Sequence, residues 1–318
     1  MDIQYLLFLQ NIRFVTDGAF NGFFSFVTTL GESTFILLLM AGIYWCVDKR
    51  SGSFMGLGYT SASMINQIFK ITFCVYRPWI RSDAIEPIAG AKTTATGYSF
   101  PSGHSAGASS AYGSLAIFYR KNKALFIYLL VTIAMVMLSR NFLGVHTPQD
   151  VIVGCLVGSS TVIVGGLLYK KWGHYKNFDI ALASGILVIG VALIIYATTK
   201  SYPVNYVDGQ LLVDPRVMIR DVFADVGLAV GAVCGWLLER RFVNFKVEAP
   251  WNKRIIRYLI GAAVVIFWKT AMTAFIKMGL GDHVGILVSN IILMLFIFVG
   301  YPLIFKKIFK REGAEQCV

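Results

Sequence analysis

The sequence has little charge. Asp, Glu, Lys and Arg together make up 14% of its 318 residues, whereas hydrophobic residues make up 56%. A soluble globular protein carries roughly 25% charged residues. This deficit and a mean hydropathy of +0.65 exclude a disordered, fibrous or ordinary cytosolic protein. The composition indicates a chain surrounded mostly by lipid, and it predicts an all-α fold, a multi-pass bundle of transmembrane helices.

Cysteine is also scarce. The chain has five cysteines and no Cys-x-x-Cys pair, so neither a zinc site nor a redox dithiol is indicated. Basic residues outnumber acidic ones by 29 to 17, which gives a formal net charge of +12. In a soluble protein this surplus could indicate nucleic acid, but in a membrane protein it first suggests basic cytoplasmic loops. We therefore expect membrane lipids as partners, and no nucleic acid.

Nine segments are long and apolar enough to be predicted as spans, each near the roughly 20 residues that a span requires. They cover residues 31–47, 53–75, 103–119, 124–143, 148–170, 178–198, 220–239, 255–277 and 284–305. Residues 5–28 are rich in Phe and Leu but are interrupted by Arg13, Asp17 and Gly18. We predict an amphipathic helix at the membrane interface there, and the alternative is a tenth span.

Basic residues favour one side of this topology. Nine spans place 18 of the 29 basic residues in connections on the same side: Lys49, Arg50, Arg120, Lys121, Lys123, Lys170, Lys171, Lys176, Arg240, Arg241, Lys246, Lys253, Arg254, Arg257, Lys306, Lys307, Lys310 and Arg311. The positive-inside rule assigns that side to the cytoplasm. Residues 76–102, 144–147 and 199–219 are then predicted to face the outside of the cell membrane.

The sharpest change in composition is the polar segment 199–219, KSYPVNYVDGQLLVDPRVMIR. It separates six front spans from three rear ones. We predict three parts: an interfacial segment at 1–30, a core with the active site at 31–198, and an exterior loop with an accessory three-span region at 199–318.

Basic and polar residues gather at the predicted exterior ends of the front spans. Lys70 and Arg77 are seven residues apart, about two helical turns, so both can project from one face at the end of the second span, where Pro78 ends the helix. Residues 100–105, Phe-Pro-Ser-Gly-His-Ser, lead into the third span. Pro and Ser suit a helix start, and free N–H groups there bind anions. Gly103 lets a ligand approach the backbone closely.

A third group lies between the fourth and fifth spans. Ser139 and Arg140 end the fourth span, and a short turn leads to His146. Asp150 follows four residues later, which places its carboxylate within reach of the imidazole.

These groups supply the parts that phosphoryl transfer requires. Lys70, Arg77 and Arg140 can hold the nonbridging oxygens of a phosphate and neutralise charge in the transition state. His104 and His146 allow one nucleophile and one general acid. A carboxylate beside a histidine can fix its tautomer and stabilise its cationic form.

Three motifs at these positions resemble those of the type 2 phosphatidic acid phosphatase superfamily, which also includes vanadium haloperoxidases. K-x6-R-P spans residues 70–78, P-S-G-H spans 101–104, and S-R-x5-H-x3-D spans 139–150, all in order and without departure. The resemblance covers about residues 30–170, and the sixth span completes the usual six-helix core. The segment GESTFILLLMAGIYWCVDKR at 31–50 also resembles bacterial membrane members. The rear spans lie outside this core.

The resemblance implies a role for each motif residue. His146 is the nucleophile that forms a phosphohistidine, His104 protonates the leaving oxygen and then activates water, and Asp150 orients His146. Phosphate is bound by Lys70, Arg77, Ser102, Gly103 and Arg140. The family works without a metal ion, so no cofactor is expected.

The resemblance therefore implies a lipid phosphatase. Phosphatidic acid, lysophosphatidic acid, phosphatidylglycerophosphate, sphingoid phosphates and polyprenyl pyrophosphate all fit the same group of cations. One alternative is a phosphotransferase that passes the phosphate, or a phosphorylated headgroup, to another lipid. Another is a non-enzymatic lipid transporter or scramblase, but binding alone requires no nucleophile. Haloperoxidases are soluble proteins, whereas this composition indicates a membrane protein.

Charged residues also occur in the rear spans. Arg216, Arg220 and Asp225 lie near the exterior end of the seventh span, and Lys269 lies inside the eighth. Charges at such depth are usually paired or functional. We expect a structural ion pair between Asp225 and Lys269, and the alternative is that the two arginines shape the entry for an anionic headgroup.

Overall fold

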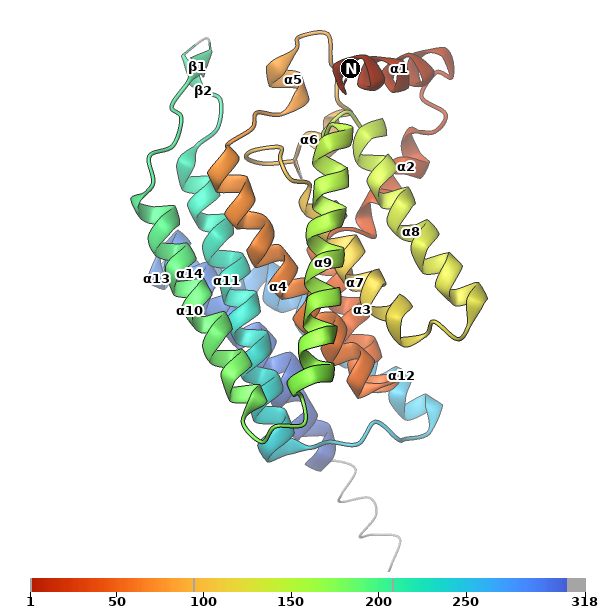
Figure 1. The fold of residues 1–318 in the computed structure, drawn as a ribbon, viewed down its shortest axis with the longest axis vertical. Helices are drawn as coiled ribbons and strands as arrows, with labels where there is room; N and C mark the ends of the chain where they lie inside the picture. The colour runs from red at the N-terminus through yellow and green to blue at the C-terminus, as the bar shows by residue number, and fades with distance from the viewer. Residues whose placement is uncertain (1, 94, 208, 308–318) are drawn as a thin grey trace, which may run out of the picture.

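The computed structural model describes residues 2–93, 95–207 and 209–307. In these ranges the chain forms a helical bundle with one short β-hairpin, so the predicted all-α class is confirmed (Figure 1). The α-helices are α1 (Asp2–Val15), α2 (Asn21–Thr29), α3 (Ser33–Cys46), α4 (Lys49–Phe73), α5 (Pro78–Arg81), α6 (Ala89–Thr93), α7 (Gly103–Phe118), α8 (Lys123–Phe142), α9 (Pro148–Trp172), α10 (Phe178–Thr199), α11 (Pro215–Leu238), α12 (Trp251–Phe267), α13 (Thr273–Leu280) and α14 (Asp282–Leu295). Three π-helical turns extend or join the rear helices: η1 (Glu239–Val243), η2 (Trp268–Met272) and η3 (Phe296–Gly300). The hairpin pairs β1 (Tyr206–Val207) antiparallel with β2 (Gln210–Leu211).

The number of membrane spans differs from the prediction. All nine predicted spans coincide with helices, but within the described ranges only six helical segments are long and apolar enough to cross a membrane. They are Lys123–Phe142, Pro148–Trp172, Phe178–Thr199, Pro215–Val243, Trp251–Leu280 and Asp282–Lys307. A seventh is counted if α2 and α3, bent by 52° at their break, form one broken span. Helices α3 and α7 are too short, with 14 and 16 residues, and α4 is less apolar.

The position of α7 in the bundle explains its composition. Helices α3, α4, α8 and α9 all pack against it, and most of its residues are buried Ala, Ser and Gly. A helix enclosed by other helices presents no surface to lipid, so it does not need large apolar side chains, and small residues let its neighbours approach closely. The same reason allows α4 to bury Asn66, Gln67 and Lys70. The prediction counted these inner helices as ordinary spans.

Two glycines bring α9 against α7. A Cβ atom on Gly154 would overlap the carbonyl oxygen of Ser102, and one on Gly158 would overlap the side chain of Ser109. This small-xxx-small spacing permits close backbone contact between helices. As a result, the first turn of α9 lies directly beside the start of α7, where the Ser102 N–H donates to the Asp150 carbonyl oxygen over 2.9 Å.

Helix α11 joins the rear helices to the front ones. It packs against α4, α10 and α14, and its contact with α14 follows a row of glycines. A Cβ atom on Gly227, Gly231 or Gly235 would lie 2.6–2.8 Å from an atom of α14 or η3. The rear helices are therefore packed directly on the predicted core, whereas the division of the chain at residue 198 stays a prediction.

The expected ion pair between Asp225 and Lys269 is not present among the described residues. Each of the two side chains instead bonds to the front part: the Gln67 Nε2 donates to Asp225 Oδ2 over 2.7 Å, and the Lys269 Nζ donates to the Ser33 hydroxyl over 2.9 Å. These partly buried bonds fix α11 and η2 to α4 and α3, because a charged group left unpaired within the bundle would be costly.

The two ends of the bundle differ in what they carry (Figure 1). One end holds α1, α5, α6 and the hairpin, together with the α8–α9 connection. Helix α1 lies across this end, where Gln10 and Arg13 donate to the carbonyl oxygens of Ala84 and Glu86. The opposite end holds the α9–α10 and α11–α12 connections and the end of the last described helix. Eleven of the 29 basic residues lie in these connections or in the helix ends beside them: Lys170, Lys171, Lys176, Arg240, Arg241, Lys246, Lys253, Arg254, Arg257, Lys306 and Lys307. The interfacial position of residues 1–30 stays a prediction.

Candidate active site

The first motif begins on the last turn of α4 and ends beyond it. Lys70 is 8% exposed, and no described residue forms a hydrogen bond to its ammonium. Helix α4 ends at Phe73, since Cys74 adopts a left-handed conformation with φ 48° and ψ 40°. Arg77 therefore lies in an extended segment just before α5. The prediction that Lys70 and Arg77 share one helical face is wrong, because the helix stops before Arg77.

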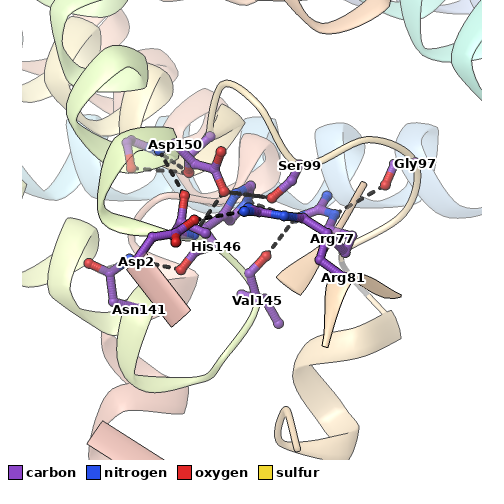
Figure 2. Close-up of polar contacts among 12 residues, drawn as sticks. Asp2, Arg77, Arg81, Gly97, Ser99, Asn141, Val145, His146 and Asp150 are labelled. Carbon is purple, nitrogen blue, oxygen red and sulfur yellow. Dashed lines mark hydrogen bonds and ion pairs between the residues drawn. The ribbon is translucent and has the colours of Figure 1, made fainter. Parts of the chain in front are cut away.

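Arg77 is held by backbone oxygens. Its Nε donates to the Gly97 carbonyl oxygen over 3.1 Å, and its Nη2 donates to that of Thr96 over 2.9 Å. Its Nη1 donates to the Val145 carbonyl oxygen over 3.0 Å and lies 2.8 Å from the Nε2 of His146 (Figure 2). Burial lowers the pKa of Arg77 to about 10, so the group still carries its charge at neutral pH. A buried cation held by dipoles alone in the described structure is suited to binding an anion.

The second motif starts α7. Ser102 is the N-cap residue, and its side chain accepts from the Ser105 N–H over 3.4 Å. Gly103 follows and is exposed. A Cβ atom there would meet only the Asn66 side chain, at 4.0 Å. Packing therefore leaves space beside Gly103. The bonds that Ser102 makes are structural, so its contact with phosphate stays a prediction.

His104 faces a cluster of positive charges. Its Nε2 is buried and has no hydrogen-bond partner among the described residues. The positive charges of Arg140, Arg77 and Lys70 act on this ring. The structure thus brings the histidine of the second motif together with residues of the other two.

Arg140 lies in the last turn of α8 and is fully buried. Its Nη1 donates to the Thr28 hydroxyl over 2.7 Å, whereas its Nε and Nη2 have no hydrogen-bond partner in the described part of the chain. Unsatisfied buried donors are costly and rare in folded proteins. Two of them on one guanidinium, close to His104, are the arrangement expected where a protein binds an anion.

His146 and Asp150 form the centre of the site. The Nδ1 of His146 lies 3.4 Å from the Asp150 Oδ2. That oxygen also accepts from the Ser99 hydroxyl over 2.6 Å and from the Thr147 N–H over 2.8 Å (Figure 2). Thr147 caps α9 in a reciprocal capping box with Asp150. The carboxylate is therefore fixed, and a proton on Nδ1 facing it leaves the lone pair of Nε2 directed at Arg77.

Burial lowers the pKa of His146 well below its usual value, and the positive charge of Arg77 adds to this effect. Asp150 acts in the opposite direction. The imidazole is consequently neutral at pH 7, which is the state in which Nε2 can act as a nucleophile.

Three residues of the site were not predicted from the sequence. Ser99 holds Asp150, Thr28 accepts from Arg140, and the Asn141 Nδ2 donates to the His146 carbonyl oxygen over 2.8 Å. Ser99 lies two residues before the second motif, and Asn141 occupies a variable position inside the third. A search of the polar residues in and beside the motifs would therefore have found both. Thr28 is 112 residues from Arg140, and no local pattern indicates it.

Sequence comparisons give the chain its family. A sequence model of the PAP2 superfamily matches residues 52–177, and one described as the PAP2 superfamily phosphatase, transmembrane extension, matches residues 223–313. The chain belongs to the PAP2 superfamily, and it is a multi-pass membrane protein. The rear helices, for which the sequence motifs gave no assignment, thus match a transmembrane extension described within the same superfamily.

Two curated relatives match part of the chain. Phosphatidylglycerophosphatase B from Bacillus subtilis (strain 168) is 30% identical over 144 residues, which cover 42% of this chain and 66% of the relative. Undecaprenyl-diphosphatase from Sulfolobus acidocaldarius is 26% identical over 140 residues, or 44% of this chain and 66% of the relative. The chain thus spans about two thirds of the length of each.

One solved structure is similar. It is a crystal structure of the first transmembrane PAP2 type phosphatidylglycerolphosphate phosphatase from Bacillus subtilis, with 25% sequence identity and a TM-score of 0.47. The similarity covers 55% of this chain and 87% of that one.

Proposed function

We propose that this protein hydrolyses a phosphomonoester or pyrophosphate of a membrane lipid through a phosphohistidine on His146. The observation that carries the proposal is the setting of the imidazole: Nδ1 faces the fixed Asp150 carboxylate, and Nε2 faces the Arg77 guanidinium. The two curated relatives are named for phosphatase activity on lipid phosphates, which supports the same substrate class. Lys70, Arg77, Arg140 and the Ser102–Gly103 segment are the proposed phosphate ligands.

The first half of the reaction transfers the phosphoryl group to the protein. The Nε2 lone pair attacks phosphorus, and the bond from phosphorus to the lipid oxygen breaks. The negative charge of the bound phosphate offsets the surrounding cations, so that His104 carries a proton, which it gives to the leaving oxygen. The Nδ1 proton remains directed at Asp150, which stabilises the positive charge that develops on the ring. The three cations neutralise the phosphoryl oxygens in the transition state.

The second half releases inorganic phosphate. Neutral His104 accepts a proton from water as the water oxygen attacks phosphorus, and the bond between phosphorus and Nε2 breaks. His104 is then protonated again and His146 is neutral again, so the site is restored. In the phosphotransferase alternative, the hydroxyl of a second lipid takes the place of water in this step.

Arg77 must move for the first step to occur. Its Nη1 lies 2.8 Å from Nε2, in the position that the phosphorus atom has to reach. We infer that an incoming phosphate draws the guanidinium onto its oxygens and so exposes the lone pair. The Arg77 guanidinium then donates to a charged phosphate oxygen instead of the neutral Nε2 of His146. Hydrogen bonds between two charged groups are stronger than those to a neutral acceptor.

The reaction is proposed to face the outside of the cell membrane. All three motifs meet at the end of the bundle that holds α1, α5 and α6, and the opposite end holds the basic connections (Figure 1). The positive-inside rule then places His104 and His146 in the outer leaflet. A lipid phosphate made inside the cell would have to cross the bilayer before it reached the site.

Phosphate release tests the proposed activity. Purified wild-type protein, in the presence of EDTA, should release inorganic phosphate from lipid phosphates and not from glucose 6-phosphate, which has no lipid tail. Lipid products are analysed in parallel, because a new phospholipid without free phosphate would identify a phosphotransferase. No product from any lipid, with movement of labelled lipid between leaflets, would instead support the transporter alternative.

Single-cysteine labelling in intact cells tests the orientation. On a background without the native cysteines, a membrane-impermeant maleimide should label a cysteine placed at the exposed Ala84. It should spare cysteines at Asn122 and Asn252, which are exposed at the opposite end. The reverse labelling would place the active site in the cytoplasm and leave the proposed chemistry unchanged.

A further inference from the structure

A cavity adjoins the active site at the junction of the core and the rear helices. It encloses about 300 Å³ and is lined by both parts of the chain. Arg77, Trp79 and Thr96 contribute from the core, and Val217 and Arg220 contribute from the start of α11. The region that matches the transmembrane extension begins at residue 223, so this wall of the cavity lies directly before it and is outside the three motifs.

Arg77 connects this cavity to the proposed nucleophile. The same guanidinium that lines the cavity lies 2.8 Å from the Nε2 of His146. A phosphate bound between Arg77 and His146 is therefore at one end of the cavity, and whatever is attached to that phosphate can extend into it.

Arg220 is the second cation in the cavity wall, and its contact with Asp221 does not use all of its N–H donors. Its Nε and Nη2 both donate to one oxygen of Asp221, over 3.3 and 2.9 Å. A guanidinium carries five N–H donors, so three remain for a ligand, and the side chain is 30% exposed. Asp214 also lines the cavity, but its carboxylate is bound by Arg216 through both oxygens and by the backbone N–H of Arg216.

Arg216 serves as an internal contrast. It is the same residue type, one helical turn earlier on α11, and its side chain is 83% exposed and paired with Asp214. It does not line the cavity. The sequence could not separate these two arginines, whereas the structure places only Arg220 in the cavity wall.

Apolar groups complete the wall. Trp79 and Val217 line the cavity, and the Arg77 guanidinium lies over the Trp79 ring at 5.9 Å from its centre. Two cations set among apolar side chains match an amphipathic molecule with anionic groups close to an apolar part. A single phosphate would occupy only the Arg77 end.

We propose that Arg220 forms a second anion subsite, which makes the enzyme prefer lipid phosphates that carry a second phosphate near the scissile one. The inference rests on the proposed function. The scissile phosphate lies between His146 and Arg77, and the second one binds Arg220. Two lipid classes share this chemistry: prenyl diphosphates, in which the two phosphates are directly bonded, and lipids in which a glycerol separates a phosphomonoester from a phosphodiester.

Paired substrates test the subsite. The ratio of kcat/KM for a prenyl diphosphate over the prenyl monophosphate of equal chain length is measured in wild type, Arg220→Gln and Arg216→Gln. The same ratio is measured for phosphatidylglycerophosphate over phosphatidic acid. We expect wild type to prefer the second phosphate in at least one pair, and Arg220→Gln to lower that ratio about tenfold, as expected for one lost charge-assisted hydrogen bond. Arg216→Gln should keep the wild-type ratio, and the pair that responds identifies the spacing.

Three results would overturn the subsite: no preference in wild type, an equal change in both arginine variants, or an equal loss on both members of each pair in Arg220→Gln. If Arg220→Gln does not fold, Val217→Glu, which places a negative charge in the same wall, should lower the same ratio. Absence of turnover in wild type would refute the proposed function alone. The subsite would then be decided by calorimetry, with a non-hydrolysable prenyl bisphosphonate expected to bind about tenfold more tightly to wild type than to Arg220→Gln, and equal affinities overturning it.

Discussion

The core and the rear helices use charged side chains in opposite ways. In the rear part, several charged groups are paired with nearby opposite charges: Arg216 with Asp214, Arg241 with Asp179, Lys277 with Asp282, and Glu239 with Lys49. Arg220 differs from these, because its contact with Asp221 uses only two of its five N–H donors. In the core, Arg77 is bound by carbonyl oxygens, and Arg140 has two buried nitrogens without a partner in the described residues.

This difference separates charges that stabilise the fold from those that are proposed to bind phosphate. A paired charge has already offset most of the cost of leaving water, whereas an unpaired buried cation retains its capacity to bind an anion. The core therefore contains cations that are available to bind an anionic ligand, and burying them without a charged partner lowers the stability of the fold. Substitutions of the core cations should therefore lower turnover, whereas substitutions within the ion pairs should lower stability.

The largest effect is expected from His146→Ala. Because no other described group lies where it could replace Nε2, turnover of a lipid phosphate should fall by about four orders of magnitude or more. Phosphate release by purified protein measures this, with Arg216→Gln as the control for handling. Retention of more than a few per cent of wild-type activity would show that His146 is not the nucleophile.

Arg140→Gln should come next. The variant keeps a polar side chain but removes the charge and the unpartnered donors, so kcat/KM should fall about 10²–10³-fold. Its thermal stability should be unchanged or higher, since an uncompensated buried charge is removed. A clear loss of stability with normal kcat/KM would contradict the distinction between cations available to a ligand and charges held in ion pairs.

Ser99→Ala should have a smaller effect on turnover. It removes the 2.6 Å bond to the Asp150 Oδ2 but leaves the Thr147 N–H bond in place. We expect kcat to fall about tenfold, the scale of one hydrogen bond to a charged group, with little change in affinity for a lipid phosphonate. If affinity falls and kcat does not, Ser99 acts on the ligand and not through Asp150.

The protonation state of His146 tests the same comparison without a measurement of turnover. Burial and the Arg77 charge lower the pKa of His146, so the ring should stay neutral as pH falls through 6.5, where an ordinary histidine becomes protonated. Nitrogen NMR of histidine-labelled protein in detergent reports this directly. The protein has four histidines, and the His146→Gln spectrum assigns the signal. Titration at or above pH 6.5 would contradict the electrostatic account.

The smallest effect on turnover is expected from Lys49→Met. Glu239 is 1% exposed and accepts from the Lys49 Nζ over 2.8 Å and from the Phe245 N–H over 3.1 Å. Loss of the lysine leaves a buried carboxylate half satisfied, which costs about 1–3 kcal/mol. Thermal inactivation should occur at a lower temperature, while kcat of the folded protein stays within about twofold. Lys49→Arg should restore stability, and a large loss of kcat would show that this pair is coupled to the site.

Local sequence was sufficient for the fold class and for the motif residues. A long apolar segment predicts a helix in lipid regardless of its partners, which is why all nine predicted segments are helical. His146 and Asp150 are four residues apart, so their contact follows from local geometry and is present in the structure. Lys70 and Arg77 show the limit of the same reasoning, because one left-handed residue at Cys74 ended the helix between them.

The sequence by itself was enough to predict the residues that are proposed to carry the chemistry, because the motifs place cations, histidines and a carboxylate at short, fixed separations. Tertiary structure decided which of these groups remain without a partner, which inner helices can be short or polar, and which of two similar arginines lines a cavity beside the site. These properties depend on contacts between segments far apart in the chain, such as Arg140 with Thr28 and Arg77 with Val145. Such contacts arise only when the helices pack, so no local pattern records them.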